Sequence, residues 1–218
     1  LKKADKNSQY VEYTKLKGDS KYKFLDDQAF TEIHCFDPVD RYLVEKLKSM
    51  AKKHGVELIM HENPNFLTPM EDIKKYAKGR KSYHHHNFYE WQKERMDILV
   101  GVSSKDKDNR KPPPKKIKVP PMPKNPDLNS KYVKEAIKYI DKHFPKNYGS
   151  SEDMIYPITH ETSEKWFKHF LTNRFDQFGA YQDAMVPNEP FMYHSVITPM
   201  LNIGLLDPQW IIDQCTKF

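Results

Sequence analysis

The most regular pattern near the N-terminus is an alternation of polar and apolar positions over residues 31–37, which predicts a short strand. Asp37 followed by Pro38 is typical of a helix start. Apolar side chains then recur at helical spacing: Tyr42, Leu43, Leu47 and Met50. Gly55 predicts the helix end, and the apolar run at residues 56–60 predicts a buried second strand. Strand, helix and strand within about 30 residues indicate parallel pairing, so we expect a partial, Rossmann-like α/β sheet.

Helical patterns continue up to a proline-rich segment. Thr68 with Pro69 and Glu71 predicts a second helix start, and residues 84–100 predict a longer helix. Residues 111–126 read KPPPKKIKVPPMPKNP and hold seven prolines, so we expect an extended, solvated linker. The predicted division is therefore a partial α/β domain at 1–110, this linker at 111–126, and a helical part at 127–218.

Everything beyond the linker has helical spacing, which favours an all-α C-terminal part. Asn129 or Ser130 is the expected cap of one helix, and Thr162 is the expected start of another. A third helix is predicted over about residues 190–203, and Asp207 with Pro208 predicts the start of a last one.

Composition excludes several classes of protein. The chain has 218 residues, 38% of them hydrophobic and 30% charged, so a core can form. No stretch approaches 18 consecutive apolar residues, so we expect no membrane-spanning helix and no membrane partner. Cys35 and Cys215 lie too far apart for a disulfide framework or a four-cysteine metal site, which favours a reducing, cytoplasmic location. The glycine-rich phosphate loops GxGxxG and GxxxxGK(S/T) are absent.

The positive charge is local. The formal net charge is +6, and residues 101–126 alone hold eight basic and two acidic residues. Four lysines of the proline-rich segment are candidates for contacts with nucleic-acid phosphates: Lys115, Lys116, Lys118 and Lys124. A solvated linker explains the same charges. His84, His85 and His86 cannot all bind one metal ion from a helix, so we interpret them as solvated or capping residues and predict no metal site.

Residues 178–208 combine small polar groups with an apolar background. Pro187 and Pro190 predict a helix that begins near Phe191, on which Ser195 and Thr198 would share a face. Hydroxyl groups and free N–H groups in the first turns of a helix can bind an anion such as a phosphate. A polar stripe packed on a neighbouring helix is the alternative interpretation.

The same segment carries a family resemblance. HSVITPMLNIGLLDP (194–208) resembles the flavin-phosphate motif of photolyases and cryptochromes, T-S-x-L-S-P-Y-L-x-F-G-x-L-S-P, with His194 in place of the leading Thr. FGAYQDAM (178–185) and FYEWQKERMDILVG (88–101) are similar to segments of the photolyase-related, bacterial-type branch. Members of that branch have an iron–sulfur cluster and often a lumazine antenna chromophore.

The resemblance implies a flavin site and a light-driven function. Ser195 and Thr198 would hold the pyrophosphate of FAD, with His194 and Tyr181 near it or near the adenosine. The family repairs pyrimidine photoproducts in DNA or senses blue light. The resemblance assigns no catalytic residue to this chain and provides no ligands for the cluster.

The chain also lacks the family's first strand-and-helix units and its later flavin-binding helices, so we expect a fragment. Such a fragment would bind FAD weakly or not at all and would be inactive alone. A second polypeptide with the missing flavin half, or a second copy of the chain, would then be its partner. The alternative function is a non-catalytic helical binding or scaffold protein that has lost flavin chemistry.

Overall fold

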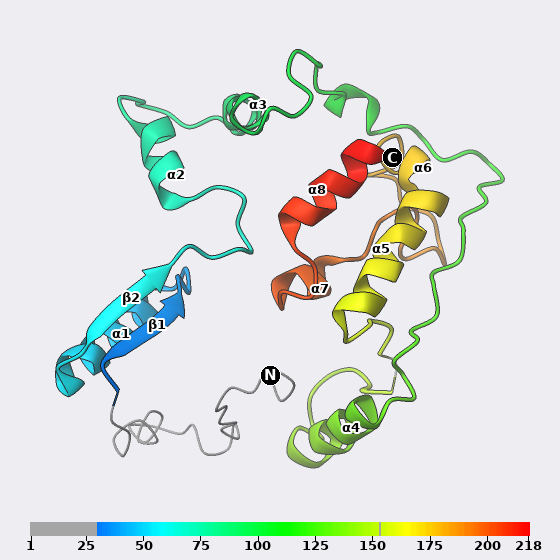
Figure 1. Ribbon diagram of the computed structural model, residues 1–218. Coiled ribbons are helices and arrows are strands. Elements are labelled where there is room, and N and C mark those ends of the chain that lie inside the picture. The colour runs from blue at the N-terminus through cyan, green and yellow to red at the C-terminus, as the bar shows by residue number, and fades with distance from the viewer. Residues whose placement is uncertain (1–29, 153) are drawn as a thin grey trace. The chain divides into compact units, whose positions relative to one another are not determined.

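The computed structural model describes residues 30–152 and 154–218 (Figure 1). The chain divides into two compact units, residues 1–63 and 64–218. Within the described part, no helix combines the length and hydrophobicity that crossing a membrane requires. The beginning of the predicted α/β part, residues 1–29, lies outside the described residues.

The N-terminal unit is a strand–helix–strand motif. Strand β1 (Glu32–Phe36) and strand β2 (Glu57–His61) pair in parallel and are connected by helix α1 (Arg41–His54). The helix ends at Gly55, whose φ of 65° places it in the left-handed region that glycine adopts without strain. The predicted parallel sheet is therefore confirmed, as a two-stranded one.

Helix α1 begins later than predicted. Asp40 is its N-cap, and the Asp40 carboxylate accepts a hydrogen bond from the backbone N–H of Leu43 at 2.9 Å. The N–H of Asp37 instead donates to the carbonyl of His61 at 2.8 Å and so extends the strand ladder by one residue. The expected start at Asp37 and Pro38 is wrong because Val39, with φ of 54°, is in the left-handed conformation and interrupts a helix before Asp40.

The second unit starts with two helices, α2 (Met70–Ala77) and α3 (His85–Met96). Pro69, not Thr68, occupies the cap position of α2, and the hydroxyl of Thr68 accepts a hydrogen bond from Gln92 of α3. The helix predicted over residues 84–100 extends four residues beyond the observed end of α3 at Met96. Asp97 ends α3 in the left-handed conformation, with φ of 53°.

The chain after α3 is held by a buried lysine. Lys93 is 6% exposed, and its ammonium group donates to the carbonyl of Val102 at 2.6 Å and pairs with Glu90 at 2.9 Å. A short 3₁₀ turn, η3 (Asp106–Asp108), precedes the proline-rich segment.

The proline-rich segment contains no helix or strand, and part of it is packed. The Tyr193 hydroxyl donates to the carbonyl of Lys118 at 3.2 Å, and Asn125 donates to the carbonyl of Tyr156 at 2.8 Å. Met122 packs against the core of the second unit. The expectation of a fully solvated linker is therefore wrong for this stretch. The segment lies inside the second compact unit, and the division into domains at 111–126 stays a prediction.

The chain beyond the prolines is helical, as predicted, and its described residues contain no strand. Its helices are α4 (Lys131–His143), α5 (His160–Asn173), α6 (Phe175–Phe178), α7 (Thr198–Asn202) and α8 (Pro208–Lys217). Helices α5, α7 and α8 gather around one apolar core (Figure 1). Its buried members are Trp166, Phe167, Phe170, Leu171, Ile197, Met200 and Leu206.

Three helix starts in this region have side-chain caps. The hydroxyl of Ser130 caps α4, and the carboxylate of Asp207 caps α8, as predicted. Helix α5 begins at Thr159, three residues before the predicted Thr162. The two threonines form a capping box, in which each side chain bonds the backbone N–H of the other.

The helix predicted over residues 190–203 is mostly absent. Only Thr198–Asn202 is helical, and the residues before it form turns in which Met192 and Val196 have φ of 44° and 55°. Met192 and Tyr193 are buried in these turns, as is Ile197 just before α7. A regular helix from Phe191 onward is therefore replaced by a turn that buries these consecutive apolar side chains.

Candidate functional site

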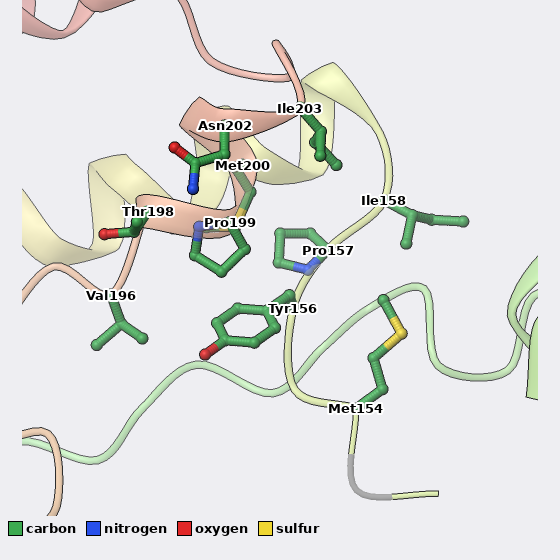
Figure 2. A pocket seen from close by; sticks show the side chains of 10 residues that line it. All are labelled: Met154, Tyr156, Pro157, Ile158, Val196, Thr198, Pro199, Met200, Asn202 and Ile203. Carbon is green, nitrogen blue, oxygen red and sulfur yellow. The ribbon is translucent and has the colours of Figure 1, made fainter. Parts of the chain in front are cut away.

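A pocket of about 580 Å³ lies between the turn that leads into α7 and the segment before α5 (Figure 2). Its lining is largely apolar: Met154, Tyr156, Pro157, Ile158, Val196, Thr198, Pro199, Met200, Asn202 and Ile203. In Figure 2, Tyr156, Pro157 and Pro199 face one another, while the hydroxyl of Thr198 and the amide of Asn202 lie at one edge. The pocket thus has an apolar body and a polar edge.

Thr198 is the predicted site residue that lines this pocket. It is exposed and is the first residue of α7, with Pro199 next to it at a position that suits a helix start. Asn202 follows four residues later, so both polar side chains lie on one face of the helix.

Ser195 lies just before the pocket and is not part of its lining. Its carbonyl accepts a hydrogen bond from the indole Nε1–H of Trp166 at 3.0 Å. Trp166 is 2% exposed in the core of α5, so this bond fixes the turn to a rigid element. Val196, the next residue, has a positive φ and faces the pocket.

His194 and Tyr181 do not line the pocket that Thr198 lines. His194 Nε2 donates to the carbonyl of Gln182 at 3.0 Å, and its ring stands edge-on to Phe178 at 5.6 Å. It lines a second pocket of about 310 Å³. The Tyr181 ring lies 5.6 Å from the ring of Tyr193. Burial, and to a smaller extent Tyr181, raises the pKa of the Tyr193 phenol. The four predicted residues are therefore not gathered around a single pocket.

The polar groups of this pocket can donate hydrogen bonds to a phosphate, but they do not neutralise its negative charge. A hydroxyl and a side-chain amide can each donate to a phosphate oxygen. In the part of the chain that the structure describes, the residues lining this pocket include no lysine, arginine or histidine. The two negative charges of an FAD pyrophosphate would therefore meet only neutral donors here. The apolar body suits an aromatic or aliphatic surface of a ligand.

The opposite wall of the pocket was not predicted. Tyr156 and Pro157 come from the loop before α5, about 40 residues away from Thr198 in the sequence. The sequence does indicate an ordered loop at this wall, since YPITHET (156–162) places a rigid proline shortly before the capping box of α5. What the sequence does not provide is the contact between this loop and α7.

Comparison with known proteins identifies the family. The family model described as deoxyribodipyrimidine photo-lyase-related protein matches residues 1–156, which is more than half of the chain. The chain belongs to this family. The matched residues end before the 194–208 motif, so this photolyase-related chain is identified from a different part of its sequence than the motif that first suggested the family.

Two relatives are similar to this photolyase-related chain. A (6-4) photolyase of Agrobacterium fabrum is 27% identical over 191 residues, covering 84% of this chain and 37% of the relative. An uncharacterised protein of Acanthamoeba polyphaga mimivirus is 44% identical over 34 residues, covering 16% of this chain and 26% of that protein. The chain therefore spans 37% or less of the length of each of these relatives.

Proposed function

We propose that this photolyase-related chain contributes the phosphate-binding turn of a flavin site to light-driven repair of pyrimidine photoproducts in DNA. One observation carries the proposal: the hydroxyl of Thr198 begins α7 at the polar edge of an apolar pocket. The relative named a (6-4) photolyase favours repair over blue-light sensing, which would use the same flavin site. When bound, FAD supplies the light-driven electron transfer.

The chain's own residues have distinct tasks in this proposal. Thr198 donates its hydroxyl hydrogen to a phosphate oxygen, and Asn202 can donate from the same edge. Ser195 adds a second hydroxyl, and the bond from Trp166 to its carbonyl holds the turn in place. His194 and Tyr181 lie outside this pocket, so we assign them to the adenosine side of the cofactor rather than to the pyrophosphate.

This chain alone binds FAD weakly in the proposal. Hydrogen bonds to a charged group contribute about 1.5–3 kcal/mol each. Two of them, less the cost of ordering the cofactor, leave an affinity closer to millimolar than nanomolar. The remaining flavin contacts come from a partner, either a polypeptide with the other helices of a flavin domain or a second copy of this chain.

Titration with three ligands tests the site. The purified chain is titrated with FAD, ADP and riboflavin, and binding is followed by flavin fluorescence and calorimetry. We expect FAD and ADP to bind with similar, weak affinity and riboflavin to bind less, because only the first two carry the pyrophosphate. The double variant Ser195→Ala, Thr198→Val should lose ADP binding.

Thr172→Val is the matched control. Its hydroxyl bonds to the carbonyl of Lys168 on α5, outside the pocket, so the variant should bind ADP like the wild type. ADP binding that the double variant leaves unchanged would contradict the phosphate role. A submicromolar FAD affinity would mean that the site is complete within this chain. Absence of binding for all three ligands would favour the non-catalytic scaffold.

DNA is the second partner in the proposal. Lys115, Lys116 and Lys124 are exposed on the proline-rich segment and can contact phosphates. Replacing Lys115 and Lys116 by Gln should lower the slope of log K against log salt by about 2, since each lost phosphate contact removes about 0.9. The control, Lys134→Gln with Lys142→Gln on α4, should keep the wild-type slope. Equal slopes for the two double variants would count against DNA contacts by this segment.

A further inference from the structure

Three side chains form a hydrogen-bonded series on one face of the two-stranded sheet. The carboxylate of Glu32 lies 2.8 Å from Nε2 of His34, and Nδ1 of His34 lies 3.0 Å from Nε2 of His61. The two imidazole rings are nearly parallel, with centroids 5.3 Å apart and an interplanar angle of 15°. The side chains of Glu32 and His34 are 49% and 50% exposed, so the series is open to solvent.

The parallel register explains why the two histidines meet. Phe36 is opposite His61, and His34 lies two residues before Phe36, so all three side chains are on the same face. The edge of the Phe36 ring packs against His61 at 6.2 Å. Both imidazoles are therefore oriented by neighbours from their own sheet.

The carboxylate determines the state of the ring nitrogens. An ionised carboxylate only accepts hydrogen bonds, so Nε2 of His34 carries the hydrogen that bonds to Glu32. In the neutral form of His34, Nδ1 then has a lone pair that can accept the hydrogen on Nε2 of His61. One hydrogen thus separates two nitrogen atoms that are both able to bind a metal.

We propose that His34 and His61 form a binding site for a divalent transition-metal ion of the class that prefers imidazole, such as Zn²⁺ or Ni²⁺. The ion takes the place of the hydrogen between Nδ1 of His34 and Nε2 of His61, and His61 changes tautomer by exchange with water, so that its hydrogen lies on Nδ1 and the ring stays neutral. Glu32 remains bonded to the far nitrogen of His34. A carboxylate in this position orients a metal-binding histidine and makes it more basic.

The geometry requires a small adjustment. Metal–nitrogen bonds of 2.0–2.1 Å with tetrahedral angles place two ligand nitrogens about 3.3 Å apart. The present separation is 3.0 Å, so the rings need to move apart by a few tenths of an ångström. Among residues 30–152 and 154–218, no group of three or more metal-binding side chains is present. Water therefore completes the coordination, and binding is weaker than at a site with four protein ligands.

Calorimetric titration of the full chain with NiCl₂ and with ZnCl₂ tests the site, with MgCl₂ as a hard cation that imidazole does not favour. The run His84, His85 and His86 can bind these ions as well, so the titrations are made in a His84→Asn, His85→Asn, His86→Asn background. We expect one ion per chain in this background, with no binding of Mg²⁺. His34→Asn and His61→Asn should each weaken the affinity by at least about tenfold, since each removes one of two ligands.

Glu32→Gln separates a metal site from a structural contact between the strands. It removes no ligand, so one ion per chain should still bind, with affinity lower by about 10–100-fold. Circular dichroism checks that each variant stays folded, and histidine ring signals in NMR spectra provide a second measurement. Addition of Zn²⁺ should shift the signals of His34 and His61. The proposal is overturned if His34→Asn and His61→Asn bind like their background, or if the triple histidine background binds no ion.

Discussion

The guanidinium group of Arg174 donates a hydrogen bond to the carbonyl oxygen of Pro121 at 2.5 Å and a longer one, of 3.3 Å, to that of Pro120. Arg174 is 1% exposed, at the end of α5, and burial lowers the pKa of its guanidinium. Proline has no N–H group, so this segment cannot form a helix or a strand ladder by itself. Its carbonyl groups are instead bound by a buried side chain.

Arg174→Met should detach the proline-rich segment from the second unit. We expect a loss of about 1–3 kcal/mol in the free energy of unfolding, because the carbonyl groups of Pro120 and Pro121 lose their charged donor. Limited trypsin digestion should show faster cleavage after Lys118, whose carbonyl is held by Tyr193 in the wild type. Arg110→Met is the matched control, since this arginine is exposed and pairs with Asp183 at the surface. Equal sensitivity of the two variants to trypsin would refute the anchoring role of Arg174.

Two glycines of the second unit should respond oppositely to replacement by alanine. Gly204 follows α7 with φ of 73°, a conformation that costs about 1–2 kcal/mol for other residues. A Cβ atom there would only touch Asn65 at 3.6 Å, so the loss in Gly204→Ala should come from the backbone. Gly179 has a helical φ of −60° and open space around it. Gly179→Ala should be neutral or stabilise by up to about 1 kcal/mol. Urea unfolding measures the stability of both variants. An unchanged unfolding free energy for Gly204→Ala would contradict a backbone cost at this position.

Local signals in the sequence were sufficient for much of the fold. The parallel strands, the glycine stop at Gly55, and the caps at Ser130 and Asp207 were predicted because each depends on residues a few positions apart. The starts of α1 and α5 were each missed by three residues, since more than one capping residue was available at each. The choice between them depends on contacts that the local pattern does not contain.

Long-range contacts account for the larger errors. The turns at residues 190–197 replace a predicted helix, and the carbonyl of Ser195 there bonds to Trp166, 29 positions earlier. The proline-rich segment was predicted to be solvated, yet Arg174 binds it across 53 positions. The candidate site also depends on a contact between distant segments that the sequence did not predict. Thr198 was predicted from its motif, but the wall that Tyr156 provides comes from another loop.

Trp166→Phe should loosen the turn before the pocket while leaving the core filled. The variant keeps an aromatic ring but loses the bond of 3.0 Å to the carbonyl of Ser195. We expect a loss of about 1 kcal/mol in unfolding free energy. ADP binding should weaken as well, because Thr198 is positioned through this turn. Trp210→Phe, in α8 against Phe167, is a control that should leave ADP binding unchanged. Weaker ADP binding in both variants would indicate general damage to the core.

The titration of His169 should contribute to the pH dependence of the unfolding free energy. Burial, and to a smaller extent the nearby charge of Arg174, lowers the pKa of this histidine below its ordinary value of 6.5. The unfolded chain therefore binds a proton at His169 that the folded chain does not, in the range between the lowered pKa and 6.5. In that range, stability rises with pH by at most about 1.4 kcal/mol per pH unit for this one group. The contribution is complete above pH 6.5 and is lost as the pH falls from there toward the lowered pKa.

Thermal unfolding of His169→Gln measures this contribution, because the amide keeps the polarity of the side chain but does not titrate. The difference in stability between wild type and His169→Gln should change in favour of the variant as the pH falls below 6.5. Thr172→Val, one turn further along α5, carries no ionisable group and should keep the wild-type pH dependence. If His169→Gln and Thr172→Val have the same pH profile, then the folded chain protonates His169 as readily as the unfolded chain does. The environment formed by burial and Arg174 would then have no effect on stability in this range.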